Sequence, residues 1–192
     1  MDSAGGSTTR LTHRQWLAHT ASHCHGVVLD LGAGQGVLGG FLPTETRWIA
    51  LEPRPSGKLR RAAARRPEAR VLAGAAEAIP LDDASVDTVV CATVLCCVTD
   101  AALALREAHR VLRPGGILHF NEHVAAPAGS IARRLQRMLS PFTKLLDHGC
   151  NPCRDTTAAL QASPFRDVHL KHLRYPGALG MLGPLIRGTA VA

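Results

Sequence analysis

Residues 27–36 read Val-Val-Leu-Asp-Leu-Gly-Ala-Gly-Gln-Gly, and this stretch decides the fold of the 192-residue chain. The apolar run 27–31 is typical of a buried parallel strand, interrupted by a single acid, Asp30. Three glycines at alternate positions permit a sharp turn and leave no Cβ in the way of an approaching ligand. We predict that residues 37–42 then start a helix whose exposed N–H groups point back toward that ligand. Strand, glycine turn and helix together indicate a site for a nucleotide-type cofactor.

A second acid follows one strand later. Residues 48–52 are predicted to form the next strand, with Glu52 at its tip. A separation of about 20 residues between a glycine turn and an acid is typical of a carboxylate that binds ribose. Each charge-assisted hydrogen bond that such a carboxylate accepts from a ribose hydroxyl contributes about 1.5–3 kcal/mol. Residues 34–39 also satisfy G-x-G-x-x-G. The pairing of turn and acid predicts a nucleoside-containing cofactor.

Length and composition favour one folded domain. A chain of 192 residues with 46% hydrophobic residues is long enough to bury a core and is too apolar for a disordered chain. We expect residues 1–25 to form an N-terminal tail and a helix, over 13–24, that caps the cofactor cleft. Residues 26–192 are expected to form a single cofactor-binding domain.

The net charge of +7 raises the question of anionic partners. Much of the positive charge lies between Arg54 and Arg70. Aromatic residues make up only 4% of the chain, so there is no set of rings on which bases would stack. A solvated helix face is therefore favoured over a nucleic-acid surface, and no nucleic-acid partner is expected.

No secretory signal or membrane span is visible. The longest apolar run, 89–98, is far shorter than the roughly 20 residues that cross a bilayer. A cytoplasmic protein is expected, with its six cysteines as thiols. His19, His23, Cys24 and His25 fit no standard zinc spacing, and the C-x-x-C at Cys150–Cys153 has no second pair, so no metal site is predicted. Cys96 and Cys97 are interpreted as small buried hydrophobes.

Further strands and helices alternate along the chain. The predicted strands cover 69–73, 86–92 and 117–122, followed by an antiparallel pair at 165–173 and 185–192. Asp100 is predicted to cap a helix over 101–112, which residues 113–116 end. This alternation predicts an α/β sandwich with a mostly parallel sheet.

A further helix is predicted near residues 131–139. Ile131, Leu135, Met138 and Leu139 recur at helical spacing, with arginines opposite them. Two interpretations remain open: a helix that covers the core, or a basic amphipathic lid or membrane-surface helix that makes peripheral membrane contact.

These residues resemble the class I S-adenosylmethionine-dependent methyltransferases in the order and content of their motifs. Residues 28–36 are similar to the first motif of that family, 76–77 to its adenine loop, and 112–116 to the turn before its fifth strand. The resemblance covers residues 27–192. It implies a Rossmann-like three-layer sandwich, with a mostly parallel seven-stranded sheet that ends in an antiparallel hairpin. It also implies S-adenosyl-L-methionine as the cofactor, rather than a nicotinamide, whose enzymes carry a second mononucleotide-binding half.

A narrower resemblance is to the methyltransferase-like seven group, which methylates the sulfur of small alkyl thiols. It is carried by Val89-Val90-Cys91, Val94-Leu95-Cys96, 110–116, Glu122-His123-Val124, Gly149-Cys150 and Arg154. That group begins with a hydrophobic membrane anchor that this chain lacks, which implies a soluble version of the enzyme. The acceptor is expected to be a small-molecule thiol, and the oligomeric state is left open.

The resemblance assigns roles to individual residues. The implied cofactor-binding residues are Asp30, Gly32, Ala33, Gly34, Gly36, Glu52, Pro53, Ala76, Glu77 and Thr93. Asp30 is expected to orient the amino group of the cofactor's methionine portion, directly or through water. Ala75 stands where many relatives carry an acid, so the adenine contact is expected to fall to Glu77. Thr93 and Leu95 are expected to line the methyl-transfer channel.

The carboxyl end of the fifth strand is expected to hold the catalytic groups, because ligands collect at that edge of an open α/β sheet. His123 is the candidate general base, with Glu122 beside it, since a histidine titrates near neutral pH. His148 is the second candidate. An alternative is that Glu122 and His123 only cap the strand and hold the following loop.

Two other functions stay open at this stage. One is a carbon or oxygen methyltransferase acting on a quinone, a phenol or a lipid-like small molecule. The other is a non-catalytic protein that binds the cofactor, or that binds RNA through its basic helix.

Overall fold

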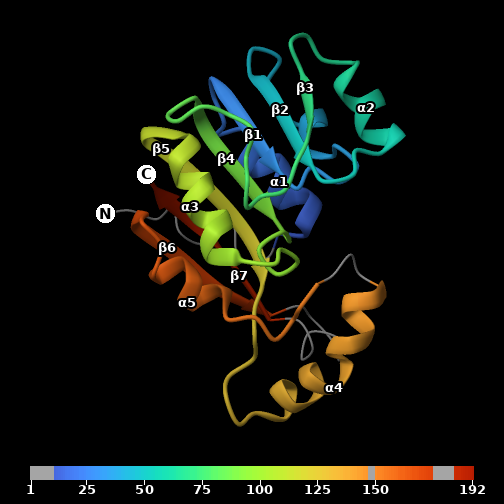
Figure 1. Cartoon of the computed structure of the whole chain (residues 1–192), viewed down its shortest axis with the longest axis vertical. Helices are drawn as coiled ribbons and strands as arrows, with labels where there is room; N and C mark the ends of the chain where they lie inside the picture. The colour runs from blue at the N-terminus through green and yellow to red at the C-terminus, as the bar shows by residue number, and fades with distance from the viewer. Residues whose placement is uncertain (1–10, 147–149, 175–183) are drawn as a thin grey trace.

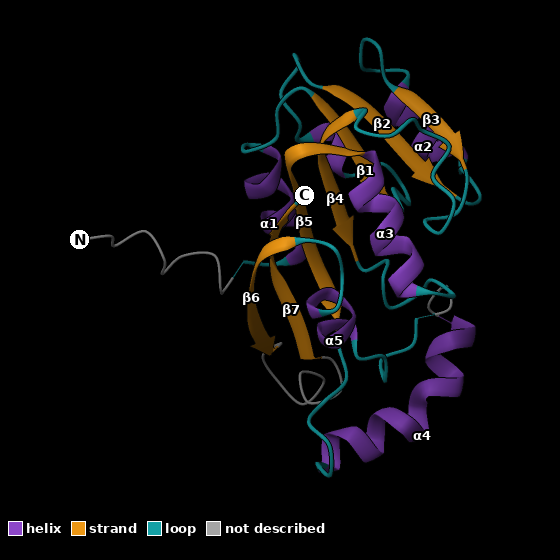
Figure 2. Ribbon diagram, turned by 60° about the vertical axis from the view of Figure 1, so that its left-hand side comes forward, coloured by secondary structure: helices purple, strands orange, loops and turns teal. Residues whose placement is uncertain are grey.

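Seven strands form one sheet in the order β3-β2-β1-β4-β5-β7-β6, as the computed structural model in Figures 1 and 2 shows for residues 11–146, 150–174 and 184–192. Strands β1 to β5 run parallel, and β7 is antiparallel to both β5 and β6. The strands are β1 Val27–Leu31, β2 Arg47–Glu52, β3 Arg70–Ala73, β4 Val86–Ala92, β5 Leu112–His123, β6 Arg166–Arg174 and β7 Pro184–Val191. The predicted fold class is confirmed.

Helices cover both faces of this sheet. Side chains alternate between the two faces along each strand, and the apolar side chains on each face pack against helices. Leu29 and Leu31 belong to the core under α3 (Ala101–Val111) and α5 (Thr156–Gln161). Val28 and Trp48 belong to the core on the opposite face, under three short helices. These are α1 (His13–Ala21), the 3-10 helix η2 (Leu38–Gly40) and α2 (Gly57–Ala63). The result is the three-layer arrangement seen in Figure 1.

Side-chain caps define where several helices begin. The predicted cap Asp100 is confirmed, since its Oδ1 accepts a hydrogen bond of 3.0 Å from the backbone N–H of Leu103. Asp155 caps α5 in the same way through the N–H of Ala158. The sequence analysis did not predict this helix, because its six residues are too few to show a periodic pattern.

The helix predicted directly after the glycine turn is wrong in extent. Only the single 3-10 turn η2 forms there. Two consecutive glycines disfavour a longer helix, and Pro43 follows at once. The Trp48 indole also packs so closely on Gly39 that a Cβ at this position would lie 2.4 Å from the ring.

Strand β5 begins earlier than predicted, at Leu112 rather than at Ile117. Residues 113–116 do end helix α3, but they remain paired with neighbouring chain. Two backbone hydrogen bonds of 3.0 Å join this segment to Ala192. The N–H of Gly115 donates to the carbonyl of Ala192, and the N–H of Ala192 donates to the carbonyl of Gly116. A φ of +80° at Gly115 lets the chain turn without losing this pairing.

Helix α4 (Ile131–Leu146) stands away from the sheet in both Figure 1 and Figure 2. The core-covering interpretation is wrong for Ile131 and Met138, which are 68% and 73% exposed. Among residues 131–141, the part of this helix whose burial the structure describes, the buried residue is Gln136, whose Oε1 accepts from the backbone N–H of Ala126 at 2.8 Å. Within the described residues, no helix is both long and apolar enough to cross a bilayer.

The contact between Gly39 and Trp48 generates a test of packing. We expect Gly39→Ala to lower the free energy of unfolding by about 1–3 kcal/mol, because the added methyl group overpacks the indole. Gly40→Ala is the matched control, since nothing lies within 4 Å of a Cβ built there. Denaturant unfolding measures both variants. Equal stability of the two would contradict the packing role assigned to Gly39.

Candidate functional site

The glycine turn adopts a backbone that requires glycine. Gly32, Gly34 and Gly36 have φ values of +68°, +55° and +80°. A Cβ on Gly32 would lie 2.4 Å from Val94, whereas a Cβ on Gly34 would meet almost nothing. Gly34 is therefore the point at which another molecule can approach the backbone closely.

The acid at the tip of β2 lies against this turn. The parallel register pairs Leu31 with Leu51, which brings Glu52 beside the glycines. The N–H of Gly34 donates to Oε2 of Glu52 at 3.0 Å. The two features singled out in the sequence therefore meet at one place, as the prediction of a shared ligand requires.

A cavity of about 800 Å³ opens at this edge of the sheet. This volume is typical of sites for ligands of cofactor size. Seven of the ten predicted cofactor-binding residues line it: Gly32, Gly34, Glu52, Pro53, Ala76, Glu77 and Thr93. The sequence analysis did not name the remaining lining residues as cofactor contacts, namely Gln35, Leu51, Arg54, Ser56, Gly74, Ala75, Ala92, Val94, Cys97, Val98 and Thr99. Most of them directly neighbour a named residue, and that adjacency was the available signal.

Three predicted contacts lie behind the wall of the cavity. Ala33 is buried, and Gly36 packs against Leu59 and Trp48. Asp30 is buried in β1, where its Oδ2 accepts a hydrogen bond of 3.3 Å from the indole N–H of Trp48. Burial, with a smaller contribution from the charge of Glu52, raises the pKa of Asp30 to about 7 against the lowering effect of the indole hydrogen bond.

The chain after β4 forms the floor of the cavity. Thr93 has a φ of +59°, a left-handed conformation that is rare for a threonine. Strained residues of this kind cluster at functional sites. Leu95, predicted to line the same channel, instead belongs to the buried core. Glu77 also lines the cavity, and its Oε1 accepts from the N–H groups of Thr99 and Asp100.

Glu122 is completely buried at the end of β5 and holds the loop after β4. One carboxylate oxygen accepts from the N–H of Val94 at 2.8 Å, and the other accepts from the N–H of Cys96 at 3.3 Å. Burial raises the pKa of Glu122 to about 7, against the lowering effect of these hydrogen bonds. The contacts favour the positioning alternative for Glu122 over direct action on a substrate.

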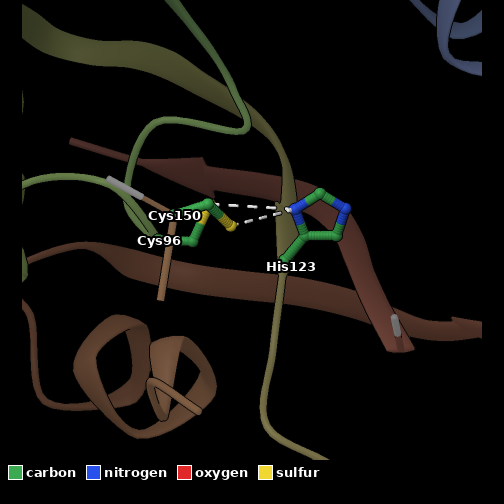
Figure 3. A group of neighbouring side chains, drawn as sticks. All are labelled: Cys96, His123 and Cys150. Atoms are coloured by element: carbon green, nitrogen blue, oxygen red, sulfur yellow. Dashed lines mark hydrogen bonds between the residues drawn. The ribbon is translucent and has the colours of Figure 1, made fainter. Parts of the chain in front are cut away.

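His123 meets two cysteines, as Figure 3 shows. Its Nδ1 lies 3.8 Å from Sγ of Cys96 and 3.7 Å from Sγ of Cys150, and the two sulfurs are 3.5 Å apart. We call Cys96, His123 and Cys150 the Cys–His cluster. Both cysteines are buried, and His123 is half-buried. His148, the second candidate base, lies outside the described residues.

No sequence pattern predicts this cluster. From the sequence alone, Cys96 is interpreted as a small hydrophobe, and Cys150 belongs to a C-x-x-C pair. The thiol of Cys150 contacts that of Cys96, and the backbone N–H of Cys153 donates to Oδ1 of Asn151. The three ligand atoms of the cluster lie within 4.8 Å of one another, a donor set that can hold a metal ion.

A third thiol connects the cluster to the cavity. Sγ of Cys97 lies 3.6 Å from Sγ of Cys96, and Cys97 also lines the cavity. Hydrogen bonding with the Cys96 and Cys97 thiols holds the pKa of Cys150 well below its usual range, and hydrogen bonding with Cys150 and Cys97 raises the pKa of Cys96. The three thiols therefore form one contiguous group that reaches the cavity.

Comparison with known proteins identifies related chains. The family described as methyltransferase domain matches residues 29–120. Thiol S-methyltransferase TMT1A of Homo sapiens is 36% identical over 170 residues, which span 85% of this chain and 70% of the relative. Thiol S-methyltransferase TMT1B of Rattus norvegicus is 35% identical over the same spans.

One similar solved structure is that of geranyl diphosphate methyltransferase in complex with GPP and sinefungin. Its TM-score is 0.72. It is 13% identical, and the match covers 94% of this chain and 76% of that one. At this identity the likeness shows the fold alone.

The buried acid of β1 generates a pH prediction. Asp30 keeps its proton in the folded chain up to about pH 7 but loses it near pH 4 when unfolded. The folded state binds the extra proton between these values, so this group's contribution to stability falls as pH rises from about 4 to 7. Asp30→Asn removes the effect. We expect the free energy of unfolding of the variant, minus that of the unsubstituted chain, to increase between pH 4 and pH 7 by about a few kcal/mol at most. Denaturant titrations without ligand measure this difference.

Asp82→Asn is the control, because Asp82 is an exposed aspartate in a loop. If the change in unfolding free energy caused by Asp30→Asn depends on pH as little as the change caused by Asp82→Asn, then Asp30 is charged in the folded chain. Burial would then not raise its pKa.

Proposed function

Because the chain belongs to the S-adenosylmethionine-dependent methyltransferases, in the family of the thiol S-methyltransferases, we propose that it methylates the sulfur of a small-molecule thiol. The observation that carries the proposal is the meeting of Glu52 with the glycine turn in one cavity, next to a group of thiols. The first feature fits the cofactor. The second lies where an acceptor would meet it.

The cavity fits an adenosyl group in size and in chemistry. The open space in front of Gly34 admits the cofactor's methionine portion, and the neighbouring Glu52 carboxylate can accept the ribose hydroxyls. Ala76 and Glu77 would border the adenine ring. Asp30 lies too deep to line the cavity, so we propose that it acts on the methionine amino group through the turn or through water.

The bound cofactor would supply a methyl group activated by a sulfonium. The residues of this chain must hold the acceptor sulfur in line with that carbon, at about 3–3.5 Å, and keep water out. Thr93, Val94 and Cys97 line the part of the cavity suited to this task. Their place at the carboxyl end of β4 is where open α/β sheets bind ligands.

Proton removal is the remaining task. The attacking species is a thiolate, and a thiol with an ordinary pKa of about 8.5 is only a few per cent ionised at neutral pH. We propose that His123 promotes this ionisation. Two observations support this role. Nδ1 of His123 contacts Cys96 and Cys150, and Cys97, the residue after Cys96, lines the cavity. Glu122 is proposed to act as a positioning residue through the backbone of Val94 and Cys96.

The role of Glu52 can be tested by calorimetry with S-adenosylhomocysteine. We expect Glu52→Ala to weaken binding on the order of 100-fold, because charge-assisted hydrogen bonds to ribose contribute about 1.5–3 kcal/mol each. Glu52→Gln keeps the shape and should lose less. Glu45→Gln, at an exposed acid, is the control. Unchanged affinity in Glu52→Ala would remove this residue from the cofactor site.

The acceptor class can be tested with a substrate panel. We expect hydrogen sulfide and small alkyl thiols to give S-adenosylhomocysteine, whereas phenols and quinols of similar size give little. Turnover of phenols without turnover of thiols would replace the proposal with oxygen or carbon methylation. Steeply salt-dependent RNA binding with no methyl transfer to any acceptor would favour the non-catalytic alternative.

A further inference from the structure

The Cys–His cluster has the dimensions of a tetrahedral metal site. Zinc bonds to cysteine sulfur at about 2.3 Å and to histidine nitrogen at about 2.0–2.1 Å, so neighbouring ligand atoms lie roughly 3.5–3.8 Å apart. The three separations here are 3.5, 3.7 and 3.8 Å. The side chains would need little movement to bind an ion.

The backbone around the cluster holds these ligands together without an ion. The buried Glu122 carboxylate accepts from the N–H of Cys96, and the N–H of Asn151 donates to the carbonyl of Cys96 at 2.9 Å. The second bond fixes the segment that carries Cys150 against the loop after β4. Partners of this kind orient the ligands of natural metal sites.

The donor set selects a soft divalent ion. Two thiolates and one neutral imidazole favour zinc over magnesium or calcium, which prefer oxygen. Two thiolate charges also neutralise the ion, so the centre carries no net charge. This balance suits Cys96 and Cys150, which are 0% and 4% exposed, because an uncompensated buried charge is costly.

We propose that Cys96, Cys150 and His123 bind one zinc ion, whose fourth position takes the sulfur of the acceptor thiol. This inference rests on the proposed function, because it takes the acceptor to be a small-molecule thiol. The zinc ion, and not His123 alone, would then promote the ionisation of that thiol. Three protein ligands with one open position are the usual pattern of catalytic zinc sites, whereas structural sites are closed by four.

Cys97 lies between the cluster and the cavity. Its sulfur lies 3.6 Å from that of Cys96, and the residue lines the cavity wall. It is not part of the set of ligand atoms that lie within 4.8 Å of one another. The cluster is thus one side chain away from the space proposed for the cofactor.

The reaction balances with no further reactant. The acceptor R–SH binds the ion as a thiolate and releases one proton to solvent, since metal coordination deprotonates a thiol. Its sulfur then forms a bond to the methyl carbon while the bond between that carbon and the sulfonium breaks. The electron pair of the broken bond stays on the sulfur of S-adenosylhomocysteine. The product thioether is a neutral, weak ligand and can leave.

Cobalt(II) is the probe, because it binds in place of zinc. Thiolates bound to cobalt give an intense near-ultraviolet absorption band that shows they are ligands. The full chain, kept reduced with a phosphine and freed of metal by chelation, is expected to bind one equivalent with this band. Cys96→Ser, Cys150→Ser and His123→Gln should each weaken binding by more than about 100-fold, since losing even a supporting residue costs about 10–100-fold. Cys153→Ser and Cys24→Ser are controls that should bind normally.

The open position is tested by adding 2-mercaptoethanol to the cobalt-loaded chain without cofactor. We expect the thiol to change the visible cobalt bands and ethylene glycol to leave them unchanged. Cys97→Ser should retain both the metal and this response. Loss of the metal in Cys97→Ser, or bands that ignore the thiol, would show a closed site and overturn the acceptor role.

Two results separate this inference from the proposed function. Absence of the thiolate band in the unsubstituted chain overturns the zinc site, and thiol methylation at an unchanged rate by metal-free protein overturns the acceptor role of the zinc; both leave thiol methylation standing. A thiol-responsive cobalt spectrum without turnover of any thiol supports the metal site and overturns the proposed function instead.

Discussion

The hydrogen bond from the N–H of Gly34 to the carboxylate of Glu52 connects the two halves of the site. It forms because β1 and β2 are parallel and in register, so the turn after one strand reaches the tip of the next. A left-handed backbone at the glycines directs the N–H toward the acid. The cavity, and the proposed cofactor position within it, depend on this geometry.

Local sequence patterns predicted this part of the molecule well. An apolar run such as Val28–Leu31, a set of alternate glycines and a cap such as Asp100 each act over a few residues, where backbone sterics and burial decide the outcome. Predictions failed where a contact distant in sequence decided the outcome. Trp48 packs on Gly39 and limits the helix after the turn, and the pairing with Ala192 extends β5 backward.

The Cys–His cluster could not be predicted for the same reason. Cys96 and Cys150 are 54 positions apart, and His123 stands between them in sequence. No spacing rule for metal or redox motifs covers such a set. Only the parallel sheet, which brings the ends of β4 and β5 to one edge, and the bond between Asn151 and Cys96 place them together. The similarity of the chain to relatives named thiol S-methyltransferases gives this group of sulfurs a chemical context.

The central claim is that the glycine turn and the acid of β2 bind the same adenosyl group. A crystal structure with S-adenosylhomocysteine tests it most directly. We expect the ribose hydroxyls on the Glu52 carboxylate and the amino-acid portion of the ligand in front of Gly34. Ligand bound in another cavity, or Glu52 turned away from the ribose, would contradict it.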